Sequence, residues 1–129
     1  MRLAPTLRRT AALVLLCVAG SVGAAPPADL DDEVVGEMMG ELMFRADLMN
    51  ALDALCPRGK TASDWHVALP ALPPEVTTPA LLDLSRRLAA DASQQLVRDN
   101  GGCATPAFAE AYAESRQSFG ELIERWRQR

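Results

Sequence analysis

The sequence has few of the side chains and none of the motifs that most often mark an enzyme. His66 is the one histidine among 129 residues. A hydrolase built on it would need a nucleophile and an orienting acid beside it, and a lone histidine is more typical of a structural or exposed position. No G-x-S-x-G, H-E-x-x-H or P-loop motif is present. We therefore predict that the protein is not an enzyme and has no catalytic residue, bound metal or cofactor.

Strand patterns are also missing. Alternation of apolar and polar residues does not persist over any useful length, and β-branched residues are sparse outside residues 76–78. A sheet needs that alternation to bury one face, whereas apolar residues here recur at three- and four-residue spacings. The predicted fold class is all-α, a small bundle of three main helices with a proline-rich loop and one disulfide.

The beginning of the chain has the order of a secretory signal peptide. Three arginines and no acid lie in the first ten residues, and an apolar run broken only by small residues follows over residues 11–25. Val22 and Ala24 occupy the two positions that a signal peptidase requires to be small. We predict a signal peptide over residues 1–24 and a single helical domain over residues 25–129, located in the bacterial periplasm.

Two other interpretations of this segment are possible. An uncleaved membrane anchor needs about 20 apolar residues, and this run is shorter and ends in glycine and alanine. A lipoprotein would be modified on Cys17, but that processing needs a small residue before the cysteine, and Leu16 stands there. Cleavage after Ala24 is the prediction we retain, and it leaves no later segment suited to stable membrane insertion.

Cleavage makes the chain more acidic. All 17 acids follow Ala24, whereas only 10 of the 13 basic residues do, so the net charge of residues 25–129 is −7 rather than −4. Nucleic acids and anionic lipids are bound by neutralising phosphates with lysine and arginine. We therefore predict no nucleic-acid partner, and instead a protein partner with a basic surface.

Cleavage also removes Cys17 and leaves Cys56 and Cys103 as an even pair. In an oxidising compartment such a pair is expected to form a disulfide, which would stabilise the fold by on the order of 4 kcal/mol in the chain-entropy model. The alternatives are less suited to the spacing. Two cysteines and one histidine are too few for a four-ligand zinc site, and neither cysteine is in a C-x-x-C redox motif.

The first predicted helix runs from about Leu30 to Leu55, after a short extended leader at residues 25–29. Acids crowd its beginning, where they favour the helix dipole, and Pro57 follows its end. The second and third helices each begin at a Thr-Pro pair, with threonine as the N-cap, and Asn100-Gly101-Gly102 separates them. The expected buried stripes are Leu81, Leu84 or Ser85, Leu88, Ala92 and Leu96 in the second, and Phe108, Tyr112, Phe119, Ile123 and Trp126 in the third.

Residues 57–77 form a proline-rich connection between the first two helices. Pro70, Pro73 and Pro74 exclude a long helix. Ser63 or Asp64 is suited to cap one short turn through Trp65, Val67 and Leu69. The predicted disulfide lies at the far end of the second helix. The connection must therefore cross back along the bundle, and loops of this length are often functional.

Acidic residues are concentrated in the first helix, where a single base, Arg45, accompanies eight acids over residues 29–53. The ordinary interpretation is a solvated face that also compensates the helix dipole. The functional interpretation is a surface that attracts a basic partner. The candidate partner-binding residues are Asp31, Asp32, Glu33, Glu37 and Glu41.

Two further features of this helix have alternative interpretations. Gly36 and Gly40 are spaced for close approach by another helix, either within the chain or from a second copy, so a homodimer through this face is a second expected assembly. Thioethers suit Cu(I), so the methionines of this helix are also a candidate metal site, although core packing is their more common use. The methionines are Met38, Met39, Met43 and Met49.

The order of these features resembles a group of uncharacterised proteobacterial exported proteins with two cysteines and a tryptophan. The residues that carry the resemblance are Leu55-Cys56, Trp65 after a short loop, Gly102-Cys103, and a last helix with an aromatic stripe. The group has no established activity. The resemblance therefore implies export, helices and a disulfide, and nothing about a reaction.

The function that the sequence favours is that of a non-enzymatic periplasmic protein that binds another protein. An inhibitor or immunity protein against an envelope-acting toxin is the specific form of this prediction, because an acidic face suits a cationic enzyme. The alternative is a carrier of a small ligand or of copper that uses the methionine-rich first helix.

Overall fold

The computed structural model describes the backbone of residues 27–57 and 64–129, and the side chains of residues 33–57 and 64–129. Within these residues the fold is all-α, as the sequence predicts, and contains no strand. The elements are the helices α2 (Pro27–Leu55), α3 (Pro79–Asp99) and α4 (Pro106–Arg127), and the short 3-10 helices η1 (Trp65–Ala68) and η2 (Pro74–Val76). The predicted signal peptide lies outside the described residues.

Capping explains where α3 and α4 begin. The Thr78 hydroxyl accepts a hydrogen bond from the Leu81 amide, the Thr105 hydroxyl accepts one from the Phe108 amide, and a proline occupies the first turn of each helix. Both predicted starts are therefore confirmed. The extended leader expected before the first helix is partly wrong, because α2 already begins at Pro27. A proline in the first turn loses no helical hydrogen bond, so it does not delay the start.

The turn between α3 and α4 also follows the prediction. Gly101 and Gly102 have φ values of 81° and 110°, a backbone region that favours glycine. Cys103 follows and is joined to Cys56, with 5.4 Å between their Cα atoms. The expected disulfide is therefore present, and it ties the end of α2 to the turn that joins the other two helices.

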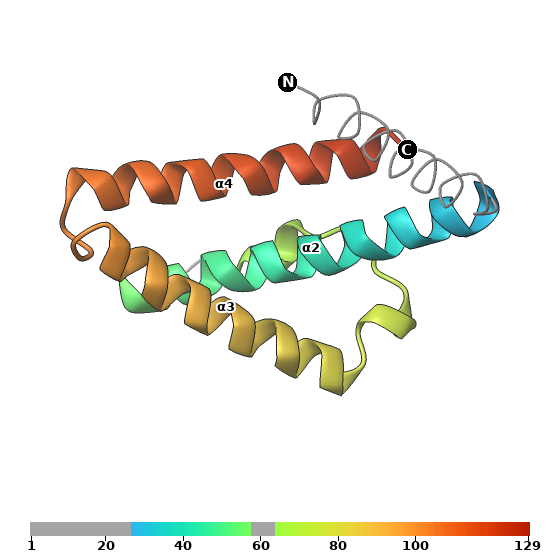
Figure 1. The fold of residues 1–129 in the computed structure, drawn as a ribbon, viewed down its shortest axis with the longest axis horizontal. Helices are drawn as coiled ribbons and strands as arrows, with labels where there is room; N and C mark the ends of the chain where they lie inside the picture. The colour runs from blue at the N-terminus through green and yellow to red at the C-terminus, as the bar shows by residue number, and fades with distance from the viewer. Residues whose placement is uncertain (1–26, 58–63) are drawn as a thin grey trace, which may run out of the picture. The chain divides into compact units, whose positions relative to one another are not determined.

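The chain divides into two compact units, Met1–Val34 and Val35–Arg129. The described part of the first is the helical backbone of residues 27–34. In the second unit, α3 and α4 meet at the Gly101–Gly102 turn and diverge from there, and α2 runs between them (Figure 1). The connection through η1 and η2 returns along α2 before α3 starts, as the position of the disulfide requires.

The core is built mostly by α2 and α4. Leu42, Met49 and Leu52 of α2 are almost fully buried, as are Phe108 and Phe119 of α4. The connecting segment adds a partly buried tryptophan, because the rings of Trp65 and Phe119 meet edge to face with 6.1 Å between their centroids. Large side chains from two helices and one loop therefore fill most of the core.

The expected buried stripe of α3 is confirmed at Ser85, Ala92 and Leu96 and wrong at Leu81 and Leu88. The buried residues of this helix are small: Ser85, Ala89 and Ser93. Ala92 and Leu96 pack against the core as expected, but Leu81, Leu84 and Leu88 are 40%, 45% and 52% exposed. Helical spacing could not choose between Leu84 and Ser85, which lie next to each other, and the structure buries the serine because it hydrogen-bonds to Asp47 of α2.

Candidate functional site

One side of α2 carries three polar residues, each three positions after the last: Asp47, Asn50 and Asp53. We call these three residues the polar ladder. Side chains at this spacing lie near one another on a helix, and each of these three binds residues of the proline-rich connection. The polar ladder therefore positions η1 and its two large side chains, Trp65 and His66.

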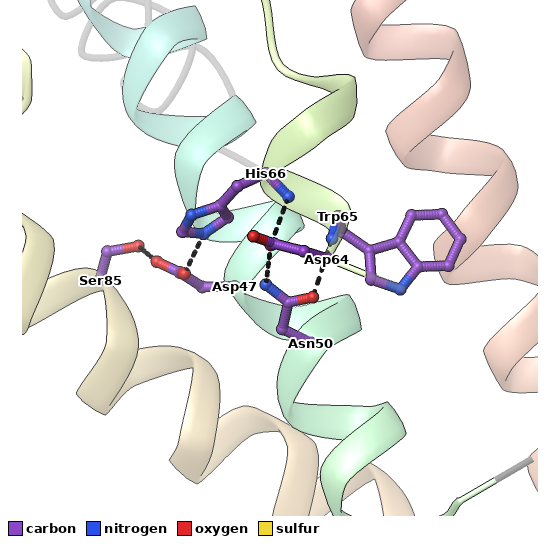
Figure 2. A network of polar contacts seen from close by, with 6 residues as sticks. All are labelled: Asp47, Asn50, Asp64, Trp65, His66 and Ser85. Carbon is purple, nitrogen blue, oxygen red and sulfur yellow. Dashed lines mark hydrogen bonds and ion pairs between the residues drawn. The ribbon is translucent and has the colours of Figure 1, made fainter. Parts of the chain in front are cut away.

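Asp47 is the most buried member, with 6% of its surface exposed. Its Oδ1 atom lies 2.5 Å from Nε2 of His66, and its Oδ2 atom accepts a hydrogen bond from the Ser85 hydroxyl at 2.6 Å. Figure 2 shows the carboxylate between the imidazole and the hydroxyl. Each oxygen has a partner, which is what allows a carboxylate to be buried here. Asp47 thereby joins α2, η1 and α3.

Asn50 holds the beginning of η1. Its side chain accepts a hydrogen bond from the Trp65 amide at 2.9 Å and donates one to Asp64 at 3.1 Å (Figure 2). Asp64 caps η1 by accepting a hydrogen bond from the His66 amide. The hydrogen bond from that amide, followed by the one from Asn50, lowers the pKa of the Asp64 carboxyl below 3.8. The expected cap is confirmed for Asp64, whereas Ser63 lies outside the described residues.

Asp53 completes the polar ladder and joins the connection to α4. Its two oxygens accept hydrogen bonds of 2.7 Å, one from the Trp65 indole and one from the Tyr112 hydroxyl. The Trp65 ring meets Phe119 on the other side. A tryptophan in a core needs a partner for its N–H group, and Asp53 provides it.

The order of contacts around His66 is not that of a Ser-His-Asp triad. In a triad the imidazole lies between the nucleophile and the acid and removes the proton of the hydroxyl. Here the Asp47 carboxylate lies between them, and Ser85 donates to the acid rather than to the base. Asp47 and His66 also line a cavity of about 490 Å³, and Asp64 and Arg86 are among its other lining residues. No group of three or more histidine, cysteine, aspartate or glutamate side chains suited to a metal ion occurs among the described residues.

A second polar cavity, of about 570 Å³, lies among the three helices. Arg45 of α2, Ala92, Gln95 and Asp99 of α3, and Glu114 of α4 are among the residues that line it. We call it the three-helix cleft. Arg45 is engaged by Glu41, with 3.5 Å between nitrogen and oxygen. The lining therefore holds two acids, Asp99 and Glu114, and one base that is paired with an acid outside the lining.

Leu81, Leu84 and Leu88, which we call the leucine row, extend the α3 side of this cleft. Ala92 and Gln95 follow Leu88 at four and seven positions, the spacings that keep residues on one face of a helix. Because the side chains of Ala92 and Gln95 line the cleft, the leucine row lies on the same face of α3. Single exposed leucines are ordinary, but three in register form a continuous apolar strip.

Of the five predicted partner-binding acids, the structure describes the side chains of three. Glu33, Glu37 and Glu41 are exposed and follow one another at four-residue intervals, so they lie along one face of α2. Asp31 and Asp32 lie in the helix, but their side chains are outside the described residues. The predicted role of these five acids in partner binding stays a prediction.

The glycines and methionines of α2 have different surroundings. A Cβ atom added to Gly36 or Gly40 would meet no described atom within 4 Å, so no close helix contact within the described chain explains these residues. The predicted homodimer through them stays a prediction. Met39, Met43 and Met49 are buried, and Met38 packs against the core. The methionines are therefore packing side chains, as their common use suggests.

The polar ladder and the three-helix cleft were missed by sequence reasoning. A signal for the ladder is present, since three polar residues recur every third position in a helix otherwise rich in buried apolar residues. The residues that bind the polar ladder could not be predicted from spacing. Ser85 and Tyr112 lie 38 and 59 positions away from the acids that they contact.

Comparison with protein-family models, curated proteins and solved structures finds no match. Within the described residues, no helix is both long and apolar enough to cross a membrane. The disulfide fits a protein that folds in an oxidising compartment. Any proposal about function therefore depends on the geometry of the chain.

Proposed function

We propose that this chain is an exported, non-enzymatic protein that binds another protein, and that the leucine row of α3 is its binding surface. The observation that carries the proposal is the exposure of Leu81, Leu84 and Leu88 on one face of a helix whose neighbouring face is packed. Burying such a strip against a partner removes apolar surface from water and favours association.

The rigidity of the surroundings supports the proposal. The hydrogen bond from Ser85 to Asp47 holds α3 on α2, and the disulfide holds the turn at its end. A strip on a fixed helix loses little conformational freedom when a partner covers it, so more of the burial is retained as affinity. The exposed acids of α2 favour a partner with basic groups and fast association.

An inhibitor or immunity protein against an envelope-acting toxin remains the specific form of the proposal. A small acidic protein with a rigid apolar strip is suited to cover a cationic enzyme. Periplasmic location is part of this proposal, supported by the disulfide and by the signal-like first 24 residues. Mass spectrometry of the protein from a periplasmic fraction should find an N-terminus at Ala25, and an uncleaved Met1 in that fraction would contradict the export step.

Site-specific photo-crosslinking tests the binding surface in cells. A photoreactive amino acid is placed at Leu84 in the full chain, and Val67, an exposed apolar residue of η1, is the matched control position. We expect a discrete adduct to a second protein from position 84 and none of that mass from position 67. The same adducts from both positions, or none from position 84, would overturn the proposal.

A further inference from the structure

We infer that the leucine row and the three-helix cleft together form one groove for an amphipathic helix of another protein, with a lysine or arginine at the end that enters the cleft. The inference rests on the proposed function and specifies its partner. Three observations carry it: the length of this face of α3, the different chemistry of its two ends, and the poor match of a second copy to both ends at once.

The face of α3 that carries the leucine row and then lines the three-helix cleft has the length and straightness that suit a helix. Leu81 and Asp99 are separated by 18 residues, which is five helical turns, so they lie in line on α3 about 27 Å apart. Apolar residues at three- and four-residue spacings on a partner helix would cover the leucines between them. A helix laid in a groove lined by other helices is a common mode of peptide recognition.

The two ends of the groove differ in polarity. Three leucines occupy the half near the beginning of α3. The other half is the three-helix cleft, where Asp99 of α3 and Glu114 of α4 line one cavity. The one basic residue of its lining, Arg45, is paired with Glu41. Glu114 forms no ion pair with another described residue. Asp99 accepts a hydrogen bond from Gln95 at its Oδ1 atom. A cationic side chain entering the cleft would therefore meet the Glu114 carboxylate and the second oxygen of Asp99.

The same polarity argues against a second copy of the chain as the occupant. Two copies of α3 paired antiparallel over the whole of residues 81–99 would set Leu81 of one against Asp99 of the other. A parallel pair would bring the two Asp99 carboxylates together. Either arrangement buries or crowds charge without a partner. A helix with an apolar stretch and a basic end matches both halves of the groove.

Two synthetic peptides of 18 residues serve as probes. Each carries four leucines at three- and four-residue spacings on an alanine-rich helix and two lysines at one end, which is the N-terminal end in one peptide and the C-terminal end in the other. A third peptide has glutamates in place of the lysines. Fluorescence anisotropy with the full mature chain measures binding, and we expect one lysine peptide to bind more tightly than the glutamate peptide.

Variants locate the bound probe. Leu84→Gln combined with Leu88→Gln should weaken binding of the preferred peptide at least about tenfold. Asp99→Asn and Glu114→Gln should each weaken it about two- to fivefold and reduce its dependence on salt. Glu75→Gln removes an exposed charge from η2, outside the cleft lining, and should leave binding unchanged. All substituted residues are exposed, and far-ultraviolet circular dichroism should confirm that each variant is folded.

Three outcomes would overturn the inference. The first is an unchanged affinity for the preferred peptide in the variant with Leu84→Gln and Leu88→Gln. Another is equal weakening by Asp99→Asn and Glu75→Gln. The third is a concentration-dependent dimer in sedimentation velocity that Leu84→Gln with Leu88→Gln abolishes, because a second copy would then occupy the groove. If one of these results is obtained but position 84 still crosslinks to another protein in cells, then the proposed function stands. Only the inference that the partner presents a helix with a basic end is then wrong.

Discussion

The helices α3 and α4 begin alike and pack differently. Each starts with a capping threonine followed by proline, and they contain 21 and 22 residues. However, α4 buries Phe108, Phe119 and Leu122, whereas α3 buries two serines and an alanine and exposes leucines. Local sequence signals therefore set where each helix starts, but not which side chains it contributes to the core.

The difference has a physical consequence for how each helix is held. Large side chains let α4 fill the core by burying apolar area, which is the main favourable term in folding. The small face of α3 is secured instead by the hydrogen bond between Ser85 and Asp47 and by the disulfide after the helix. Because α3 does not need Leu81, Leu84 or Leu88 for packing, these three leucines remain available for a partner.

Removing a large side chain from each helix should give the greatest contrast. Phe119→Ala in α4 should lower the free energy of unfolding by about 3–5 kcal/mol, because it leaves a cavity and removes the ring contact with Trp65. The matched change Leu88→Ala in α3 should lower it by less than about 0.5 kcal/mol, because this side chain is half exposed. Urea unfolding measures both, and similar losses would contradict the difference between the helices.

Enlarging the small face of α3 should have the next largest effect. Ala89 is fully buried, so Ala89→Leu should destabilise the fold by about 1–3 kcal/mol through overpacking. The exposed Ala107 of α4 is the control, and Ala107→Leu should change the free energy of unfolding little. If thermal unfolding shows that Ala89→Leu is neutral or stabilising, then the face of α3 is not closely packed.

Removing the hydroxyl of Ser85 tests the polar attachment of α3. Ser85→Ala leaves the buried Asp47 with His66 as its one remaining partner and should lower the free energy of unfolding by about 1–2 kcal/mol. Ser93→Ala is the matched control, since that hydroxyl donates only to the Ala90 carbonyl of its own helix. Urea unfolding should give the smaller loss for Ser93→Ala, and the reverse order would remove the role assigned to Asp47.

The smallest effect concerns acid and the cap of η1, the segment that brings Trp65 to α4. The pKa of Asp64 is lower in the folded chain than its ordinary value of 3.8, because the His66 amide and Asn50 donate hydrogen bonds to its carboxylate. Its contribution to stability is therefore present above pH 3.8 and is lost as the pH falls through the folded pKa. Unfolding measured across this range should show a weaker dependence on acid for Asp64→Asn, and identical slopes would contradict this.

Much of the fold was predictable because its signals are local. The Thr-Pro starts, the glycine turn and the all-α class depend on residues close together in the sequence, and the structure confirms each of them. The disulfide followed from there being one pair to join once Cys17 is removed. These features require no knowledge of what packs against what.

The candidate sites were not predictable in the same way. The spacing of Leu81, Leu84 and Leu88 matches a buried stripe, with Ser85 as an alternative to Leu84. The hydrogen bond from Ser85 to Asp47 decides for the serine, and the structure buries Ser85 and Ala89. In the sequence, the acids of the polar ladder look like solvated charges. Only the structure places Trp65 and Tyr112 beside Asp53. Helical periodicity identifies a face but cannot say what opposes it.

The sequence by itself therefore determined three helices, their ends apart from the start of α2, and the cysteine pair, because capping, proline, glycine and periodicity act within a few residues. Only the tertiary structure decided that α3 turns its small residues inward and the leucine row outward. The reason is that the hydrogen bond from Ser85 to Asp47 joins residues 38 positions apart. That choice created the leucine row and, with it, the surface that we propose binds a partner.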